Sequence, residues 1–479
     1  MLGQAYREYP FIHRQSGWIE IDPDQVWQAT QESIAEAATA AGRIDPPKAL
    51  AISCLGEAVT PIAHDGTALD LSAVGFDNRS LPQSDWWEQE MGREALFQIT
   101  GQPLSLIYTI NKIMWWRDNC PEIFRRTWKF LCYGDLTAMR LGAEPVIDHS
   151  MAARTMAFDI RRRRWSGEIL QKAGLSEELL ARAAPSGTVI GEVSKKVAQE
   201  VRLPRGVKVV TGGHDQPCGA LGAGIVEAGI AMDATGTVEC ITPAFSSPVL
   251  TDAMLKGNYP CYPHVAPHMY VTISFNFTGG SLLRWYRDVL GKQERDEAEV
   301  AGVDVYDIII ARASSEPTNL LVLPHFTVAG TPWMDPHSKG AIVGLSLSTT
   351  KAELIKALLE GLTFEMRLNL DYLREAGVRI QHLRAIGGGA KSATWLQLKA
   401  DIFGRPVCSL SVSEAACLGA AILAGVAVGE YSSVREAAQQ IVKITRTFEP
   451  DPSRASRYEE RLRLYHELYP TLRDLAHKM

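Results

Sequence analysis

Val209-Val210-Thr211-Gly212-Gly213-His214-Asp215-Gln216 is the stretch that decides the fold of this 479-residue chain. Its apolar start predicts a buried strand over residues 207–211, the glycine pair predicts a tight turn, and Asp215 opens a helix. In open α/β sheets, ligands bind beyond the carboxyl ends of the strands, so Asp215 is placed to face one. A helix N-terminus favours an ionised carboxylate, which suits a base that accepts a hydroxyl proton. The alternative is an aspartate that only caps the helix.

The same alternation of strand and helix runs along the chain in both directions. Residues 49–53 predict a buried strand, and residues 26–38 predict a helix capped by the acids before it. Further strands are predicted at residues 230–233, 269–275, 320–323, 341–347, 382–386 and 406–410, and further helices at residues 351–375, 392–403 and 414–423. Such alternation indicates an α/β protein, and the length exceeds one ordinary core. We expect two domains, residues 1–227 and 228–479, with ligands in the cleft between them.

The composition is that of a folded globular protein, with 46% hydrophobic and 22% charged residues. A net charge of −6 gives no reason to expect a nucleic-acid partner or an anionic membrane. The most apolar stretch, residues 219–232, is too short and too interrupted to cross a bilayer. The eight cysteines form no C-x-x-C pair, which argues against a zinc knuckle and fits reduced thiols in the cytoplasm.

Two glycine motifs come directly after predicted strands in the second half of the chain. Thr235-Gly236-Thr237 offers successive N–H groups and hydroxyls that can form an anion-binding concavity, although an ordinary turn is the alternative. Gly387-Gly388-Gly389-Ala390-Lys391-Ser392 joins a strand to a helix, and its bare backbone could lie against a base or a phosphate. It fits neither the Walker nor the G-x-G-x-x-G pattern, so a plain connection stays open.

Charged groups lie after two strands in the first half of the chain. Gly56-Glu57 comes after the strand at residues 49–53, and Asp77-Asn78-Arg79 comes after another. Carboxylate and guanidinium groups at strand ends can hydrogen-bond sugar hydroxyls. The alternative is a set of surface ion pairs with no ligand.

In their order and separation, these motifs resemble the FGGY family of carbohydrate kinases. Other segments similar to that family are Lys112-Ile113-Met114-Trp115, residues 145–165, Gly340 to Leu345, and Glu353-Leu354 with Glu360. The resemblance extends over residues 4–468, and the combination is specific although each motif alone is weak.

The resemblance implies an α/β fold of two actin-like (ribonuclease H-like) ATPase domains that close around ATP, Mg²⁺ and a small sugar or polyol. It implies that Asp215 is the general base, and that the same carboxylate contacts the sugar and the metal. The residues implied to hold the nucleotide are Thr235, Gly236, Thr237, Gly387, Gly388, Gly389, Ala390 and Ser392. The residues implied to bind the sugar are Gly56, Glu57, Asp77 and Arg79.

The sequence therefore predicts a cytoplasmic ATP-dependent carbohydrate kinase, with a xylulose-like ketose as the first candidate for its acceptor. The alternative is a catalytically impaired, sugar-responsive binding protein on the same scaffold, against which the retained Asp215 argues. Glycine at position 56 departs from the family's usual pairing, so the sugar cannot be carried over from relatives. No nucleic acid or membrane is expected as a partner, and the oligomeric state stays open, a homodimer included.

The start of the chain departs most from the family pattern. Family members open with a strand, an Asp-x-Gly-Thr hairpin that grips phosphate and magnesium, and a second strand. Here residues 1–10 already resemble the family segment that lies beyond the hairpin, and no Asp-x-Gly-Thr occurs near them. We expect the gene product to begin upstream, because loss of two strands would leave an unpaired sheet edge and an unfilled core. The alternative is a protein that does without this phosphate-binding element.

We predict that an upstream extension of about 20–25 residues, enough for two strands and a hairpin, raises both thermal stability and kinase activity. The added strands would cover bare backbone groups, and the hairpin amides would stabilise phosphate charge from a second side. The comparison is this chain beside a version started at an upstream in-frame codon that encodes Asp-x-Gly-Thr. Equal stability and equal activity of the two proteins would refute the expectation.

Overall fold

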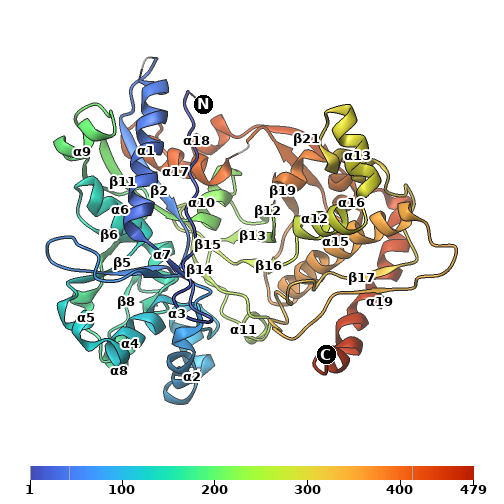
Figure 1. Ribbon diagram of the computed structural model, residues 1–479, viewed down its shortest axis with the longest axis horizontal. Helices are drawn as coiled ribbons and strands as arrows, with labels where there is room; N and C mark the ends of the chain where they lie inside the picture. Colours follow the sequence, from blue (N-terminus) through green and yellow to red (C-terminus); the bar gives the residue numbers. More distant parts are fainter. Residues whose placement is uncertain (1, 43, 413) are drawn as a thin grey trace. The chain divides into compact units, whose positions relative to one another are not determined.

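Strand β11 (Lys208–His214) runs parallel to β2 (Ala49–Cys54) in the computed structural model, and helix α10 (Asp215–Gly222) begins where β11 ends (Figure 1). The predicted strand and helix are confirmed. The predicted glycine turn is wrong, because β11 continues through the glycine pair with a shift of register against β2. The structure describes residues 2–42, 44–412 and 414–479.

The chain divides into two compact units. The first comprises residues 2–226, 261–271 and 415–441, and the second comprises residues 227–260, 272–414 and 442–479. The chain thus enters the second unit at Glu227 and returns to the first unit twice. The domain boundary predicted from the sequence, between residues 227 and 228, lies within one residue of the first crossing. The sequence predicts neither of the two returns.

The first unit holds an antiparallel sheet in the order β1-β4-β3-β5 and a second sheet in the order β10-β11-β2. Helices α6, α10 and α17 pack against β2 and β11. The other strands of this unit are β1 (Glu20–Ile21), β3 (Val59–Ile62), β4 (Ser72–Ala73), β5 (Lys129–Cys132), β6 (Val146–Asp148), β7 (Phe158–Asp159), β8 (Arg164–Trp165), β9 (Arg182–Ala184), β10 (Val189–Glu192), β14 (Tyr262–Pro263) and β15 (Tyr270–Val271). Its other helices are α1 (Pro23–Ala41), α2 (Leu81–Glu90), α3 (Arg93–Thr100), α4 (Thr109–Asn119), α5 (Pro121–Arg126), α6 (Tyr133–Leu141), α7 (His149–Ala153), α8 (Gly167–Lys172), α9 (Lys195–Glu200), α17 (Ala415–Ala427) and α18 (Val434–Ile441), with short 3₁₀ turns at Asn78–Ser80 and Glu177–Leu179.

The second unit is built on a sheet whose strands have the order β16-β13-β12-β19-β20-β21. Only the pairs β12–β19 and β19–β20 are parallel, so these three strands end at the same edge. The strands of this unit are β12 (Ile230–Thr235), β13 (Glu239–Phe245), β16 (Ser274–Asn276), β17 (Leu321–Leu323), β18 (Ala341–Val343), β19 (His382–Gly387), β20 (Val407–Leu410) and β21 (Ile444–Phe448). Its helices are α11 (Asp252–Lys256), α12 (Gly280–Val289), α13 (Lys292–Ala301), α14 (Val305–Ala311), α15 (Lys351–Glu375), α16 (Ala393–Phe403) and α19 (Pro452–Ala476), with a 3₁₀ turn at Gly388–Lys391.

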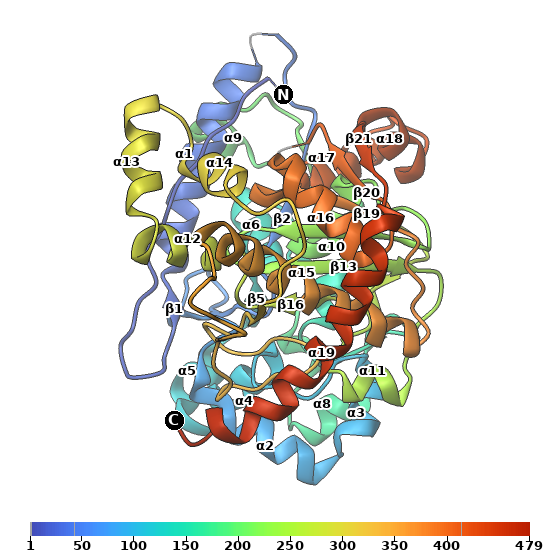
Figure 2. The same ribbon diagram turned by 90° about the vertical axis from the view of Figure 1, so that its right-hand side faces the viewer.

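Helix α15 is the centre of the second unit's core. Its N-terminus is fixed by a capping box, in which the hydroxyl of Thr350 accepts from the N–H of Glu353 and the Glu353 carboxylate accepts from the N–H of Thr350. Residues 355–371 of the helix are buried without interruption. Figure 2 shows the C-terminal helix α19 running beside α15 and α16. Aromatic side chains of α19 pack into the same hydrophobic core as side chains of α15 and α16. The predicted helix at residues 351–375 is confirmed.

Two predicted strands differ from the observed ones. Residues 341–347 form a strand only over β18, because the chain leaves the hairpin at Gly344 and exposes Leu345 and Leu347 to solvent. Residues 269–275 form two short strands, β15 and β16, because the first half of this run stays with the first unit and the second half with the second unit.

No helix in the described ranges combines the length and the apolar composition needed to cross a bilayer. None of the eight cysteines, which all lie in the described part of the chain, forms a disulfide.

Candidate active site

Asp215 stands at the first position of α10, where the chain leaves β11. Its side chain is 45% exposed, whereas the adjoining residues of β11 are buried. Surrounding protein and the charge of Glu57 raise the pKa of Asp215 to about 6, against the opposing effects of the N–H of Gln216 and the guanidinium of Arg154. The carboxylate is therefore ionised at neutral pH and accessible to a ligand, as a general base must be.

Glu57 and Arg154 form a buried ion pair beside Asp215. The Nε atom of Arg154 donates to Oε1 of Glu57 over 2.5 Å, and a terminal nitrogen of Arg154 also contacts this carboxylate. Arg154 donates in addition to Oε1 of Gln102 over 3.1 Å, and its guanidinium lies 5.2 Å from the ring of Tyr108 and 5.5 Å from that of Tyr262. The alternative of a surface ion pair is thus wrong for Glu57, which is only 8% exposed.

The backbone at Glu57 is strained, because its φ is +63°, a value that residues other than glycine rarely adopt. The carbonyl group of Glu57 accepts a hydrogen bond from the hydroxyl of Thr109 over 3.0 Å. Its neighbour Gly56 packs against the imidazole of His214, and a Cβ atom at position 56 would lie 2.9 Å from Nε2 of that ring. The structure therefore brings Gly56, Glu57 and Asp215 together, and it explains the glycine by close packing. Strain of this kind concentrates at functional sites.

Asp77 and Arg79 bind each other in a separate network. The carboxylate of Asp77 accepts from Arg79 over 2.7 and 2.8 Å and from the N–H of Ile19 over 2.8 Å. Arg79 also pairs with Glu20 over 2.6 Å, and its guanidinium lies 3.8 Å from the ring of Trp18. The side chains of the Asp77–Arg79–Glu20 set are fully buried, so this network holds β1 to the segment that precedes α2. A direct contact of Asp77 or Arg79 with a sugar stays a prediction.

The two glycine motifs lie on neighbouring strand ends in the second unit. Thr235, the last residue of β12, pairs in register with Gly387, the last residue of β19. A Cβ atom at position 389 would lie 2.7 Å from Cβ of Thr235, so only glycine allows this approach. The N–H of Gly280 at the start of α12 donates to the carbonyl of Gly236 over 2.8 Å, which brings a helix N-terminus to the same place.

A hollow of about 280 Å³ opens at these two loops. The loop residues that line it are Thr235, Gly236, Thr237, Gly388, Gly389, Lys391 and Ser392, and α12 and α14 with the residue before α14 contribute Arg284, Asp304, Tyr306 and Asp307. Ser392 also caps α16, because its hydroxyl accepts from the N–H of Trp395 over 3.2 Å. Of the predicted nucleotide residues, Gly387 and Ala390 support the loop without lining the hollow. Glycine backbone at two strand ends beside a helix N-terminus favours a phosphate-bearing ligand.

Residues 1–222 match the N-terminal domain, and residues 232–428 the C-terminal domain, of the FGGY family of carbohydrate kinases. The chain is 28% identical over 477 residues to the xylulose kinase of Bacillus subtilis (strain 168), a match that covers 99% of this chain and 93% of that protein. It is 30% identical over 477 residues to the autoinducer-2 kinase of Klebsiella pneumoniae, with 98% of this chain and 89% of that protein covered. The crystal structure of xylulose kinase from Rhodospirillum rubrum superposes with a TM-score of 0.87 at 26% identity, over 98% of this chain and 94% of that one.

The chain belongs to the FGGY family of carbohydrate kinases. The resemblance read from the motifs is confirmed, and so is the enzyme class, a phosphotransferase with an alcohol group as acceptor. The fold is the two-domain FGGY kinase fold, an α/β fold of the actin-like ATPase class.

Sequence reasoning missed a buried lysine beneath the glycine loop of this FGGY kinase. Nζ of Lys399 on α16 donates to Asp233 over 2.7 Å, to Thr235 over 2.6 Å and to Glu239 over 2.8 Å. Burial and the charge of Asp233 raise the pKa of Glu239 above its usual value, against the opposing effect of Lys399. The sequence did carry a signal for this cluster, a lysine in the mostly apolar segment from Trp395 to Phe403. A lysine buried in such a segment requires anionic partners.

Other groups that the sequence did not reveal surround Asp215. They are Arg154 and Tyr262, which come from distant parts of the first unit, together with Tyr108, whose ring lies against Arg154. Their local sequence carries no sign of this meeting, since the contacts arise only when β11, α7 and the hairpin β14–β15 pack together.

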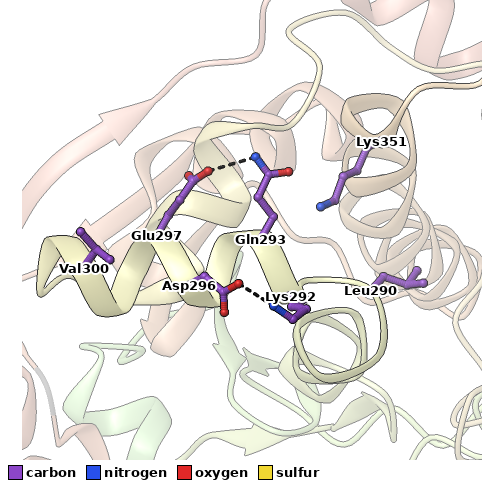
Figure 3. Close-up of a pocket in the computed structure, with 7 residues that line it drawn as sticks. All are labelled: Leu290, Lys292, Gln293, Asp296, Glu297, Val300 and Lys351. Atoms are coloured by element: carbon purple, nitrogen blue, oxygen red, sulfur yellow. Dashed lines mark hydrogen bonds and ion pairs between the residues drawn. The ribbon is translucent and has the colours of Figure 1, made fainter.

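A larger hollow in this FGGY kinase, of about 640 Å³, lies over α13 and the start of α15 (Figure 3). Four of its polar residues already bind one another, with Lys292 donating to Asp296 over 2.8 Å and Gln293 to Glu297 over 3.0 Å. Its lining residues include no glycine and none of the predicted site residues. The smaller hollow at the glycine loops is therefore the candidate nucleotide site.

We predict that Lys399→Met destabilises the protein by about 3–5 kcal/mol and raises the KM for ATP, because two carboxylates are left buried without their cation. Thr235 loses its partner in the same variant, so the glycine loop loses its support. The measurements are chemical denaturation and initial rates at varied ATP. The matched control combines Lys399→Met with Asp233→Asn and Glu239→Gln, which removes all three charges and should recover part of the stability. A single variant as stable as the wild type would contradict this account.

Proposed function

We propose that this FGGY kinase transfers the γ-phosphoryl group of ATP to a hydroxyl of a small sugar or polyol, with a xylulose-like ketose as the first acceptor to test. The observation that carries the proposal is the half-exposed carboxylate of Asp215 at the start of α10, beside the buried pair of Glu57 and Arg154. Similarity to xylulose kinases over nearly the whole chain supports the choice of acceptor. The proposed location is the cytoplasm, where the eight cysteines of this chain, none of them in a disulfide, would stay reduced.

The first unit supplies the acceptor half of the proposed reaction. Asp215 accepts the proton of the sugar hydroxyl. The oxygen of that hydroxyl attacks the γ-phosphorus, and the bond between this phosphorus and the bridging oxygen of ADP breaks. Glu57 hydrogen-bonds a second hydroxyl of the sugar, and Gly56 leaves room for the ring of His214. Because Asp77 and Arg79 bind each other in a buried ion pair, we propose that they support the sugar-binding residues from the interior of the first unit.

The second unit supplies the nucleotide half. Thr235, Gly236 and Thr237 would hold ATP phosphates through N–H groups and hydroxyls, and the loop Gly387–Ala390 with Ser392 would lie by the adenosine. Mg²⁺ bound with ATP would neutralise phosphate charge. Within the described ranges no group of three or more His, Cys, Asp or Glu side chains could hold a metal ion by itself. A single carboxylate such as Asp215 fits Mg²⁺, which the substrate's phosphates and water otherwise coordinate.

The function is tested by measuring ADP release with purified protein against a panel of ketoses, polyols and aldonates, with and without Mg²⁺. D-xylulose is expected to give the highest kcat/KM among the ketoses. The phosphorylated product of each active acceptor is then identified by mass spectrometry. Sugar binding without any acceptor-dependent ADP release would favour the impaired binding protein.

We predict that Asp215→Asn lowers kcat by at least about a hundredfold and leaves both KM values within about threefold, because asparagine is nearly isosteric but accepts no proton. In the wild type, log kcat/KM for the sugar should fall below pH 6 with a slope of one, since the pKa of Asp215 is about 6 in the free protein and only its ionised form can act. The control is Asp24→Asn, whose side chain is 78% exposed at the start of α1. Unchanged turnover of Asp215→Asn at saturating substrates would refute the assignment.

We predict that Glu57→Gln raises the KM for the sugar by about tenfold, which corresponds to about 1.4 kcal/mol, and leaves the KM for ATP within about twofold. Because the charge of Glu57 raises the pKa of Asp215 in the free protein, the acidic limb of the kcat/KM profile should also move to lower pH. The matched control is Glu144→Gln, which removes a surface glutamate that pairs with Arg182 over 3.0 Å. An effect confined to ATP would place Glu57 on the nucleotide side.

A further inference from the structure

Helix α6 packs against β2, β6 and β11 around a small void in the interior of the first unit. Its volume of about 10 Å³ leaves room for about one water molecule. Most of its lining is apolar, and the two carboxyl groups among its lining residues are those of Asp135 on α6 and Asp148 at the end of β6. Both side chains are buried, with Asp135 1% and Asp148 4% exposed. Two acids therefore share one void that is closed to solvent.

The two acids differ in their hydrogen bonds. Oδ2 of Asp148 accepts from the N–H of Ser150 over 2.7 Å, from the hydroxyl of Ser150 over 2.6 Å and from the hydroxyl of Ser186 over 2.9 Å. Oδ2 of Asp135 accepts from the N–H of Cys132 over 3.2 Å. Oδ1 of Asp135 is buried and has no hydrogen-bond partner among the described residues. The protein thus replaces the water around an ionised Asp148, but it does not do so for Asp135.

The surroundings of Asp135 favour its neutral form. The ionisable groups that face it are Asp148 and the thiols of Cys54 and Cys132, and no lysine or arginine of the described chain pairs with either acid. Burial raises the pKa of Asp135 to about 8, and the charge of Asp148 adds to the effect, against the opposing effect of backbone N–H groups. Burial also raises the pKa of both thiols well above the usual value, so they stay neutral. The N-terminus of α6 favours an anion only weakly compared with the cost of burying an unpaired charge.

Asp148 also holds the end of β11. The hydroxyl of Ser150 donates to Asp148 and at the same time accepts from the backbone N–H of His214 over 3.0 Å. Gly212 and Gly213 line the void, at the place where β11 shifts its register against β2. A Cβ atom at position 213 would lie 2.9 Å from Oγ of Ser150, so the strand passes close to this anchor. The carboxylate of Asp148 therefore acts on the backbone that leads into α10.

We propose that Asp135 keeps its proton in the native protein, that one water in the void joins it to the carboxylate of Asp148, and that this arrangement fixes the end of β11. The acid of Asp135 donates to the water, and the water donates to Asp148, so the unpartnered oxygen gains a partner. Loss of the proton would set two buried anions against each other across one water and weaken the anchor of β11. The consequence for catalysis rests on the proposed role of Asp215 as the base, whereas the protonation of Asp135 does not.

The test is Asp135→Asn, because asparagine has the shape of the protonated acid and cannot ionise. A carboxyl group whose pKa is raised by folding costs stability as the pH rises toward that pKa, and the variant escapes this loss. We expect the Tm of the variant, relative to the wild type, to rise by at least about 3 °C between pH 5 and pH 8.5. The matched control is Glu353→Gln, at the same helix position of α15, whose surface carboxylate accepts from the N–H of Thr350 over 2.8 Å. Hydrogen bonds lower the pKa of Glu353, so its variant should gain no stability at pH 8.5. An Asp135→Asn variant without this relative gain would overturn the proposal.

Infrared spectroscopy reports the proton itself, because a protonated carboxyl group has a C=O band separate from those of carboxylates. At pH 7 we expect the spectrum of the wild type minus that of Asp135→Asn to contain one such band, and the difference against Glu353→Gln to contain none. The absence of the first band would overturn the proposal. Neither this measurement nor the Tm requires kinase activity, so failure of the proposed base at Asp215 would leave both unchanged.

The link from Asp135 to the end of β11 has a kinetic test. If Asp215 is the base, kcat/KM of the wild type for the sugar should fall at least about threefold relative to that of Asp135→Asn between pH 7 and pH 9, as Asp135 ionises. A ratio that stays constant over this range would overturn the link to β11.

Discussion

The buried ion pair between Glu57 and Arg154 is the interaction on which the acceptor side depends. It joins the end of β2 to the end of α7, and it holds Glu57 in a left-handed conformation that the chain would not otherwise keep. Loss of either partner leaves the other charge buried without compensation, which commonly costs several kcal/mol. The rings of Tyr108 and Tyr262 lie against the same guanidinium, so distant segments meet at one point.

The second unit uses a buried cation in the same way. Lys399 reaches from α16 to the end of β12 and binds Asp233, Thr235 and Glu239, directly beneath the first glycine loop. In both units, then, a buried cation supports a loop at the candidate site. Loops that carry function need such support, because their own backbone makes few of the hydrogen bonds that stabilise strands and helices.

The two charged sites differ in what they leave exposed. In the first unit the network ends at Asp215, whose half-exposed carboxylate is the only acid of the predicted set that keeps free access to a ligand among the described residues. In the second unit the charges of Lys399, Asp233 and Glu239 are buried, and the hollow is lined by the glycine loops together with charged side chains that include Arg284, Asp304 and Lys391. An exposed carboxylate suits a proton acceptor, and glycine loops beside cationic side chains suit a polyanion, so the two sites fit the proposed transfer reaction.

The sequence by itself determined the local elements and the chemical type of the site. The strand β11 with Asp215 after it, the capped helix α15 and the glycine motifs at strand ends result from periodicity, capping and the steric freedom of glycine, which act over a few residues. The tertiary structure alone decided that Gly387 pairs beside Thr235, that Glu57 is buried against Arg154, and that Tyr262 reaches His214. Those contacts join residues far apart in the chain, and they exist only because strand pairing and core burial select one arrangement out of many that the local preferences allow.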